Sequence, residues 1–204
     1  MVSMTDTTDA PRAPGRPRSI HADKAILEAT LDLLAEGNSI EALSIEAIAG
    51  RAGVGKATIY RRWSGKETLL HDALCQLKPP PPEPLGRSVR EDLIALVSCS
   101  GGHNPDARVD RIVPCILPLI KRSPERWYQL YQDIVEPRRQ RLREVLRRGI
   151  ALGEIRADLD IELAVSLLTA PLVVQRLLCA NPDLDEHDLP TRLVDLVIAG
   201  IAAR

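Results

Sequence analysis

The residues best suited to do chemistry in this sequence are a run of cations that contains no acid. Positions 51 to 66 hold Arg51, Lys56, Arg61, Arg62 and Lys66. A second basic cluster, near the start of the chain, consists of Arg12, Arg16 and Arg18. The acids gather elsewhere, notably at 183–188, and the formal net charge is only −1. The distribution of charge, more than its sum, therefore predicts local contact with phosphate groups.

Groups that would catalyse a reaction or hold a metal do not form a pattern. The histidines lie far apart in the sequence, at His21, His71, His103 and His187. No serine or cysteine stands in a nucleophile motif, and no glycine-rich phosphate loop is present. Among the cysteines, only Cys99 and Cys115 with His103 hint at a metal set, and their spacing matches no zinc pattern. The sequence predicts no catalytic site, no metal and no cofactor.

Composition predicts a soluble globular protein, with 45% apolar and 27% charged residues. The N-terminus is polar and acidic, without the apolar stretch of a secretory signal. The most apolar segment, 161–180, contains Glu162, Pro171 and Arg176, which argues against a membrane span. We therefore expect a protein of the cytoplasm that is not associated with the membrane. Without an export signal, the four cysteines are expected to be buried thiols, namely Cys75, Cys99, Cys115 and Cys179.

Apolar periodicity predicts an all-α protein of about nine helices, since alternating strand patterns are absent. Residues 1–19 are interpreted as a flexible basic arm, 20–78 as a first domain and 79–204 as a second, because a proline run at 79–84 favours a stiff spacer. Gly37 is expected to end the first helix. Four helix starts are predicted from capping residues, at Ser44, Ser64, Ser88 and Asp160. Two more helix starts are predicted where proline follows Asn104 and Ser123. The helix that contains Pro114 and Pro118 is predicted to be bent or split.

The segment Ser44 to Trp63 has the pattern of two short helices joined by a tight turn. Gly53 is placed where such a turn needs a left-handed backbone. Ile59 and Trp63 have core spacing. The second helix then presents outward Lys56, Thr58, Tyr60, Arg61 and Arg62. These groups suit phosphates and base edges in a DNA major groove, so the unit is interpreted as a helix-turn-helix without a wing.

Residues 20–77 resemble the DNA-binding domain of the tetracycline-repressor-like (TetR) family. The matching core is ALSIEAIAGRAGVGKATIYRRWSGKETLL, Ala42 to Leu70, and the tetrapeptide GRPR at 15–18 also recurs at the front of many members. The resemblance implies phosphate contacts from Ser44, Thr58 and Lys66, and from the hydroxyl of Tyr60. Arg62 stands where many members have histidine or tyrosine. Gly55 departs from the serine that usually caps the recognition helix, at a cost of only a few tenths of a kcal/mol.

Base reading is assigned to Lys56 and Arg61, and entry into the minor groove to Arg16 and Arg18 of the arm. Each contact has a plainer alternative. Tyr60 would instead cover the helix packing. Lys66 and Arg51 would instead be solvated surface charges.

The resemblance continues at 153–178, which looks like the penultimate helix of many such regulators and its lead-in. It implies a homodimer in which the last two helices of each subunit form a four-helix bundle. Apolar residues around these helices favour the same interpretation. The expected interface residues are Leu167, Leu168, Leu172, Leu193, Leu196 and Val197. The alternative is that both helices are buried within one subunit.

A small-molecule pocket is expected among the helices of 88–150, beside the proline-interrupted segment. Its candidate residues are Cys115, Leu119, Trp127, Tyr128 and Tyr131, which favour an apolar or aromatic effector. The predicted function is a transcriptional regulator that binds a palindromic operator in double-stranded DNA, as a repressor released by its effector. The alternative is a helical interaction protein whose basic helix binds another protein, and an enzyme is a distant third.

Overall fold

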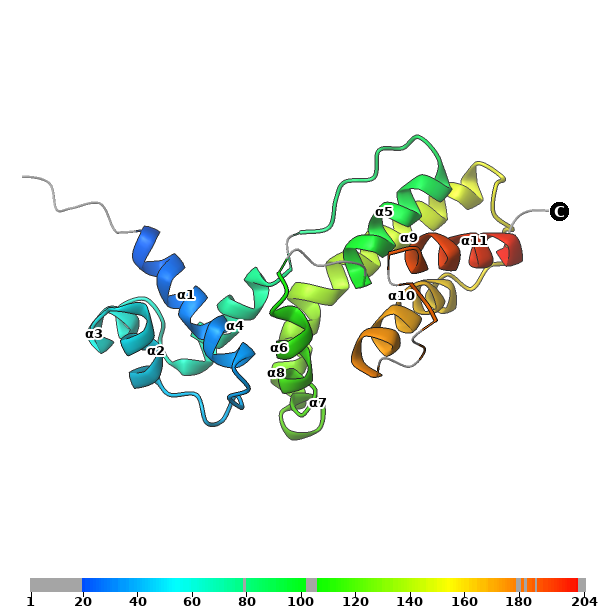
Figure 1. Ribbon diagram of the computed structural model, residues 1–204. Coiled ribbons are helices and arrows are strands. Elements are labelled where there is room, and N and C mark those ends of the chain that lie inside the picture. Colours follow the sequence, from blue (N-terminus) through cyan, green and yellow to red (C-terminus); the bar gives the residue numbers. More distant parts are fainter. Residues whose placement is uncertain are drawn as a thin grey trace, which may run out of the picture.

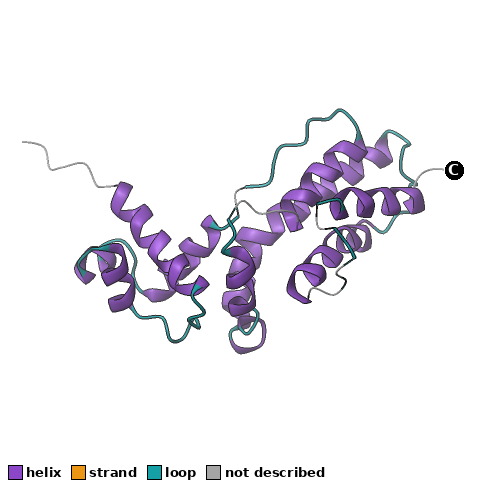
Figure 2. Cartoon of the chain, viewed as in Figure 1, coloured by secondary structure: helices purple, strands orange, loops and turns teal. Residues whose placement is uncertain are grey.

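The computed structural model describes residues 20–78, 80–101, 106–178, 181, 183–185 and 187–201, and every regular element among them is helical (Figure 2). The predicted all-α class is confirmed. Two of the segments, α6 and α7, are pieces of one interrupted helix, whereas α8, η1 and α9 follow one another without a break. Counted in this way, the described residues form nine helical units (Figure 1).

The N-terminal lobe contains the helices α1 (Ile20–Ala35), α2 (Ile45–Ala52), α3 (Lys56–Tyr60) and α4 (Lys66–Gln76). In α1, Ile26 and Leu34 repeat at helical spacing and are fully buried. The predicted stop at Gly37 is confirmed, because its φ of +93° lies in the left-handed region that favours glycine.

The capping predictions have mixed outcomes. The hydroxyl of Ser44 accepts a hydrogen bond from the Ala47 N–H, Ser88 accepts one from Glu91, and Asp160 accepts one from Leu163. The box expected at Ser64 is wrong, because the residue before α4 is Gly65 and no side chain caps that helix. Thr68 instead turns its hydroxyl back and donates to the Gly65 carbonyl. Pro124 begins its helix as predicted, and residues 104–105 lie outside the described residues.

The remaining helices are α5 (Val89–Gly101), α6 (Val109–Ile116), α7 (Leu119–Arg122), α8 (Pro124–Leu130), η1 (Tyr131–Val135), α9 (Glu136–Ala151), α10 (Ile161–Leu178) and α11 (Leu189–Ile201). The predicted split is confirmed: α6 ends at Ile116 and α7 begins after Pro118. Pro118 has no N–H to donate to the Pro114 carbonyl, so the helix cannot continue in α-register.

A second proline shapes the long helix that runs from α8 into α9. Pro137 stands at the start of α9 and has no N–H to donate to the Asp133 carbonyl. The turn before it is a π-helix, η1, in which the Glu136 N–H reaches the Tyr131 carbonyl. Such π-turns are rare and are frequently found at functional sites.

Two apolar cores divide the molecule at a place other than the proline spacer. The first core is formed by the four N-terminal helices, α1 through α4, together with residues of α6, α7 and α8 such as Ile112, Leu119 and Leu130. The second core joins α5, α9, α10 and α11 around Leu93, Leu142 and Leu168. In Figure 1, α6 to α8 accordingly lie against the N-terminal lobe, and the α8–η1–α9 helix connects the two cores.

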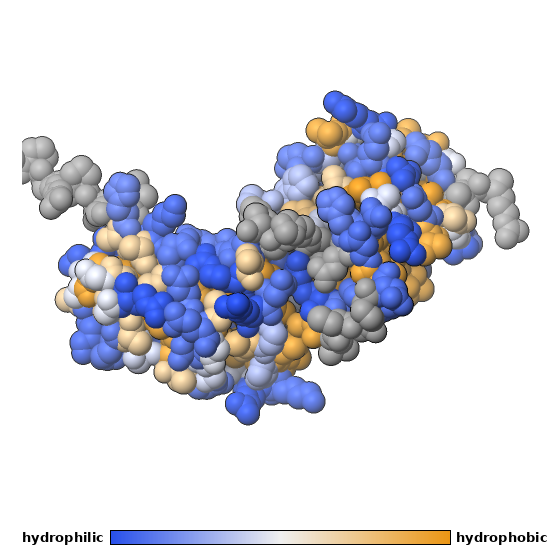
Figure 3. Space-filling view, viewed as in Figure 1, coloured by the Kyte–Doolittle hydropathy of each residue, from blue (hydrophilic) through white to orange (hydrophobic). Residues whose placement is uncertain are grey.

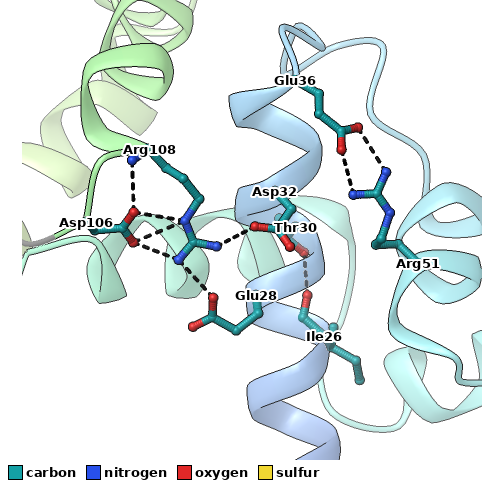
Figure 4. A network of polar contacts seen from close by, with 8 residues as sticks. All are labelled: Ile26, Glu28, Thr30, Asp32, Glu36, Arg51, Asp106 and Arg108. Carbon is teal, nitrogen blue, oxygen red and sulfur yellow. Dashed lines mark hydrogen bonds and ion pairs between the residues drawn. The ribbon is translucent and has the colours of Figure 1, made fainter.

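Arg108, just before α6, adds a polar connection between α1 and the second half of the chain (Figure 4). Its guanidinium lies 2.8 Å from Glu28, 2.6 Å from Asp32 and 2.7 Å from Asp106. The hydrogen bonds that Arg108 donates to Asp106, and also to Asp32 and Glu28, raise the pKa of Arg108 further above its ordinary value. α6 is therefore held to α1 by charge as well as by the shared core.

Two further expectations are settled by burial and hydropathy. The cysteines Cys75, Cys99 and Cys115 are half-buried, not buried as predicted, while Cys179 and His103 lie outside the described residues. Among the helices of the described residues, none has the length and apolarity that a membrane crossing requires.

Candidate DNA-binding surface

The turn between α2 and α3 is built as the sequence predicts. Gly53 has a φ of +66° and donates its N–H to the carbonyls of Ala49 and Gly50. The next N–H, that of Val54, also bonds to Ala49 at 3.0 Å. These bonds satisfy the carbonyls at the end of α2 and let α3 begin almost at once. Gly55 precedes α3 without a side-chain cap, as its missing hydroxyl requires.

The inner side of this unit is fixed by apolar packing and one polar contact. Ile48 and Ile59 are fully buried, and Trp63 is nearly so. The Trp63 indole N–H donates to Asp72 of α4 at 2.8 Å. The predicted core roles of Ile59 and Trp63 are confirmed, and the end of the helix-turn-helix is tied directly to α4.

The outer side of α3 is polar and accessible. Tyr60 is 56% exposed, which excludes the alternative that it covers the helix packing. Lys56 and Arg61 are exposed beside it, and Thr58 is half-buried. Among the described residues, the Arg61 side chain has no ion pair, so its guanidinium is available to an external acceptor. At the start of α2, Ser44 accepts its capping bond and keeps its hydroxyl proton free to donate.

The other cations of the run already have partners within the chain. Arg51 binds Glu36 through two hydrogen bonds of 2.7 and 2.9 Å, and Lys56 lies 2.8 Å from Glu46. Both pairs are exposed, so DNA phosphate can compete with these carboxylates.

Arg62 and Lys66 are held more firmly. Arg62 is largely buried, forms an ion pair with Asp23 of α1 and donates to the Thr58 carbonyl. Lys66 donates to the carbonyls of Ile40 and Glu41 at 3.2 and 3.0 Å, which secures the loop before α2. The structure therefore gives both residues a scaffolding role in the free protein. The arm residues Arg16 and Arg18 lie outside the described residues.

A pocket of about 460 Å³ lies behind the helix-turn-helix, between α4 and the α7–α8–η1 segment. Leu70, Leu74, Leu119 and Leu130 form apolar wall, and charged or polar groups, Glu67, His71, Asp72, Arg126, Gln129 and Asp133, complete the lining. Of the five predicted ligand residues, Leu119 alone is part of this lining. Trp127 packs on the first core, Tyr128 is exposed, and Cys115 and Tyr131 lie outside the lining.

Sequence reasoning missed the polar lining for an identifiable reason. Glu67 and His71 share one face of α4, and Arg126 and Asp133 stand on the α8–η1 helix. Polar residues on a helix are ordinarily solvated, so their spacing alone gave no reason to place the two sets face to face. The only indication in the sequence that this part of α4 packs against another element was the apolar pair Leu70 and Leu74, which stand beside Glu67 and His71.

The predicted interface residues fall into two groups. Leu168 and Leu172 are 0% and 2% exposed in the second core, so assigning them to a dimer interface was wrong. They belong to the core that α10 shares with α5, α9 and α11, and the sequence pattern does not distinguish burial in that core from burial against a partner subunit. Leu193 and Val197 are partly buried against the same core. Leu167 and Leu196 are exposed, together with Leu163, Val173 and Val174.

An all-α chain with a helix-turn-helix and a second helical lobe has the architecture of a class of DNA-binding regulators. Residues 26–73 match the model of the bacterial regulatory proteins of the tetR family, and residues 83–197 match that of the tetracyclin repressor-like C-terminal domain. The chain belongs to the TetR family. As a member, the protein is a DNA-binding transcriptional regulator and not an enzyme.

The chain is 30% identical over 176 residues to the uncharacterized HTH-type transcriptional regulator YdeS of Bacillus subtilis, a match that covers 85% of this chain and 87% of YdeS. Its fold is similar to that of FadR from Bacillus subtilis in complex with stearoyl-CoA, with a TM-score of 0.65, 20% identity and coverage of 87% and 98%. It is also similar to the flavonoid-responsive regulator FrrA, with a TM-score of 0.64, 22% identity and coverage of 88% and 94%.

Proposed function

We propose that this regulator is a homodimeric repressor that leaves a palindromic operator when a small molecule occupies the pocket behind α4. The observation that carries the proposal is the Trp63–Asp72 hydrogen bond of 2.8 Å. Asp72 lines the pocket, and Trp63 lies three residues after the end of the recognition helix α3. A ligand that contacts Asp72 therefore acts on the residue that sets the position of α3. In the cell, we expect this regulator in the bacterial cytoplasm at its operators.

The reading surface is assigned to Ser44, Thr58, Tyr60, Lys56 and Arg61. Their donors are exposed or half-exposed on the outer side of α2 and α3. Arg61 is the first candidate for base recognition, because guanidinium groups bind guanine edges through two bonds. Arg16 and Arg18 remain proposed minor-groove contacts.

The lining of the pocket sharpens the expected effector. An apolar wall of leucines meets Arg126, His71 and three carboxylates, so an apolar or aromatic body with a polar end fits better than a purely apolar molecule. Regulators of this fold that are bound to stearoyl-CoA, or are named as flavonoid-responsive, support a small-molecule effector. The ligand releases DNA only if it prefers one spacing of the recognition helices, and 1.4 kcal/mol of preference is about tenfold.

The proposed dimer surface is an apolar stripe on α10, together with Leu196 of α11. Leu163, Leu167 and Val174 are separated by four and seven residues and therefore share one side of the helix. Leu196 is 74% exposed in the protomer. The face drawn in Figure 3 shows apolar residues reaching the surface of the C-terminal lobe. In a dimer, the recognition helices α3 of the two subunits would lie at the spacing of two operator half-sites.

The decisive test is a selection of duplexes from a random pool, followed by binding to the selected site at several salt concentrations. A palindromic site bound with an affinity that falls steeply with salt supports the proposal. Absence of any enriched sequence would instead favour a protein partner for the basic helix.

Leu196→Glu should convert the dimer to monomer in light scattering and abolish operator binding, because a charge in an apolar interface is costly. Lys121→Glu on exposed α7 is the control that should remain dimeric.

The effector is sought by the fluorescence of Trp127 and Trp63 during a small-molecule screen. A compound that changes this fluorescence should release operator DNA over the same concentration range. Tight binders of the pocket that leave DNA affinity unchanged would contradict the switch.

A further inference from the structure

Three donor groups from distant parts of the sequence converge at the junction between α4 and η1. They are the Nε2 atom of His71, the Sγ atom of Cys75 and a carboxylate oxygen of Asp133, and all lie within 4.8 Å of one another. The His71 nitrogen is 2.8 Å from Asp133 and 3.6 Å from the Cys75 sulfur. None of the three belongs to the reading surface.

The backbone explains why these groups meet. His71 and Cys75 are four residues apart on α4, so their side chains lie on one face of the helix. Asp133 is in the centre of η1, where the π-turn that precedes Pro137 changes the direction of the side chains. One helix supplies two donors and the other supplies one.

Two of the three donor–donor distances are close to those of a tetrahedral metal site, and the third, between Cys75 and Asp133, is within 4.8 Å. Zinc bonds of about 2.1 Å to nitrogen and oxygen and about 2.3 Å to sulfur place neighbouring donors about 3.4–3.6 Å apart. The observed distance of 3.6 Å between nitrogen and sulfur already has this value. The 2.8 Å contact between His71 and Asp133 needs to open by only about half an ångström.

We propose that His71, Cys75 and Asp133 form a binding site for a zinc-like divalent cation that joins α4 to η1. A nitrogen, a thiolate and a carboxylate are the ligand types of zinc, and three protein ligands leave one position open. His71 and Asp133 also line the pocket, so the open position is reached from that side. A water molecule or the polar end of an effector completes the coordination.

The electrostatic environment favours a cation at this position. Burial, with the charges of Asp133 and Asp72, raises the pKa of the Cys75 thiol to about 11. A bound divalent ion reverses this effect and displaces the thiol proton. Arg126, a cation on the same pocket, is neutralised by its ion pair with Glu67.

The site is tested on the full-length protein with Co²⁺ as a spectroscopic probe and Zn²⁺ as a competitor. We expect one equivalent of Co²⁺ with a thiolate charge-transfer band, which Zn²⁺ removes. Cys75→Ser should abolish the band. His71→Gln and Asp133→Asn should weaken binding by more than the 10–100-fold typical of a lost outer-shell partner. Asp133 is exposed, so this variant keeps the fold and remains informative if Cys75→Ser does not fold.

Cys115→Ser and Cys99→Ser are the matched controls, because both thiols are half-buried outside the cluster. Binding that disappears in either control and persists in Cys75→Ser overturns the proposal, as does the absence of a thiolate band in the wild type. The clamp itself is tested by hydrogen exchange: Zn²⁺ should slow exchange in α4 and η1 of the wild type and not of Asp133→Asn. Metal binding without this protection overturns the clamp. Neither readout uses DNA, so both are independent of the proposed repression.

Discussion

The two arginine-rich segments of this protein use the same side chain for opposite purposes. The helix α9 carries Arg139, Arg141, Arg143 and Arg148 in ion pairs with acids of α5, α10, the spacer or α9 itself. The helix-turn-helix has fewer arginines, yet Arg61 extends from it without an ion pair among the described residues. Density of cations in the sequence therefore does not locate an anion-binding surface. Arg147 of α9 is likewise exposed without an ion pair among the described residues, so what distinguishes the reading surface is that Arg61 stands beside other exposed donors, Lys56 and Tyr60.

Burial separates the paired cations further. The pair between Arg148 and Asp92 has its carboxylate inside the protein, with only 2% of Asp92 exposed. Asp92 also accepts from the Leu85 and Gly86 N–H groups at 2.8 and 3.0 Å, which attaches the proline-rich spacer to α5. The Arg51–Glu36 and Lys56–Glu46 pairs near α3 lie in water. Removing one partner should thus have very different consequences in the two regions.

The largest effect is expected from Asp92→Ala. This change leaves Arg148 and two backbone N–H groups without their acceptor and should lower the free energy of unfolding by about 3–5 kcal/mol. Urea denaturation measures it, with Glu91→Ala on the exposed side of the same turn as the control. Burial opposes ionisation of Asp92, but the bonds from Arg148, Gly86 and Leu85 prevail and hold its pKa below the usual value. The stabilisation is therefore present above about pH 4 and lost as the pH falls through the lowered pKa.

Lys78 provides the next largest effect, as a cation surrounded by other cations. Burial, with the charges of Arg138 and Arg176, lowers its pKa from 10.5 to about 8. Between these values the unfolded chain binds more protons than the folded one, so stability rises with pH across this window. Relative to Lys78→Met, the wild type should gain up to about 3 kcal/mol between pH 8 and pH 10.5. Denaturation of both proteins at several pH values checks this, and a constant difference would refute the buried charge.

Arg61→Ala tests the reading surface at a smaller scale. Loss of a base contact should cost about 1–3 kcal/mol at the preferred operator and relax the choice of base at one position. Arg147→Ala on exposed α9 removes the same charge far from α3 and should leave both properties unchanged. Tyr60→Phe should weaken all operators about equally. Equal weakening of every site by Arg61→Ala would reassign this residue to phosphate contact.

The smallest effect is expected from Glu36→Gln. Its carboxylate binds Arg51 in a fully exposed pair, and the hydrogen bond from Arg51 lowers the pKa of Glu36. Water and salt replace such a pair readily, so the denaturation midpoint should stay within error of the wild type. A measurable loss of stability would show that the exposed Arg51–Glu36 pair contributes to stability as the less exposed pairs of α9 do.

Local patterns were sufficient wherever a short segment decides its own structure. The helix-turn-helix follows from Gly53, the cap at Ser44 and the apolar spacing of Ile48 and Ile59, all within a few residues. Where two helices meet, such patterns were insufficient. Leu167 and Leu168 are adjacent leucines of α10, yet the first is half-exposed and the second fully buried. Only the packing of α5 and α9 against one side of α10 distinguishes them.

The sequence by itself determined the helical class, the reading helix and the family, because these depend on periodicity, turn residues and an ordered motif. Tertiary structure alone decided which cations are free, where the pocket lies, and that His71 and Cys75 meet Asp133. Those properties depend on contacts between different helices, which join residues from 10 positions apart, in the Lys56–Glu46 pair, to more than fifty, in the His71–Asp133 pair. Which residues make such contacts is set by the packing of the helices as they bury two apolar cores at once. The pattern of a single helix does not contain that information.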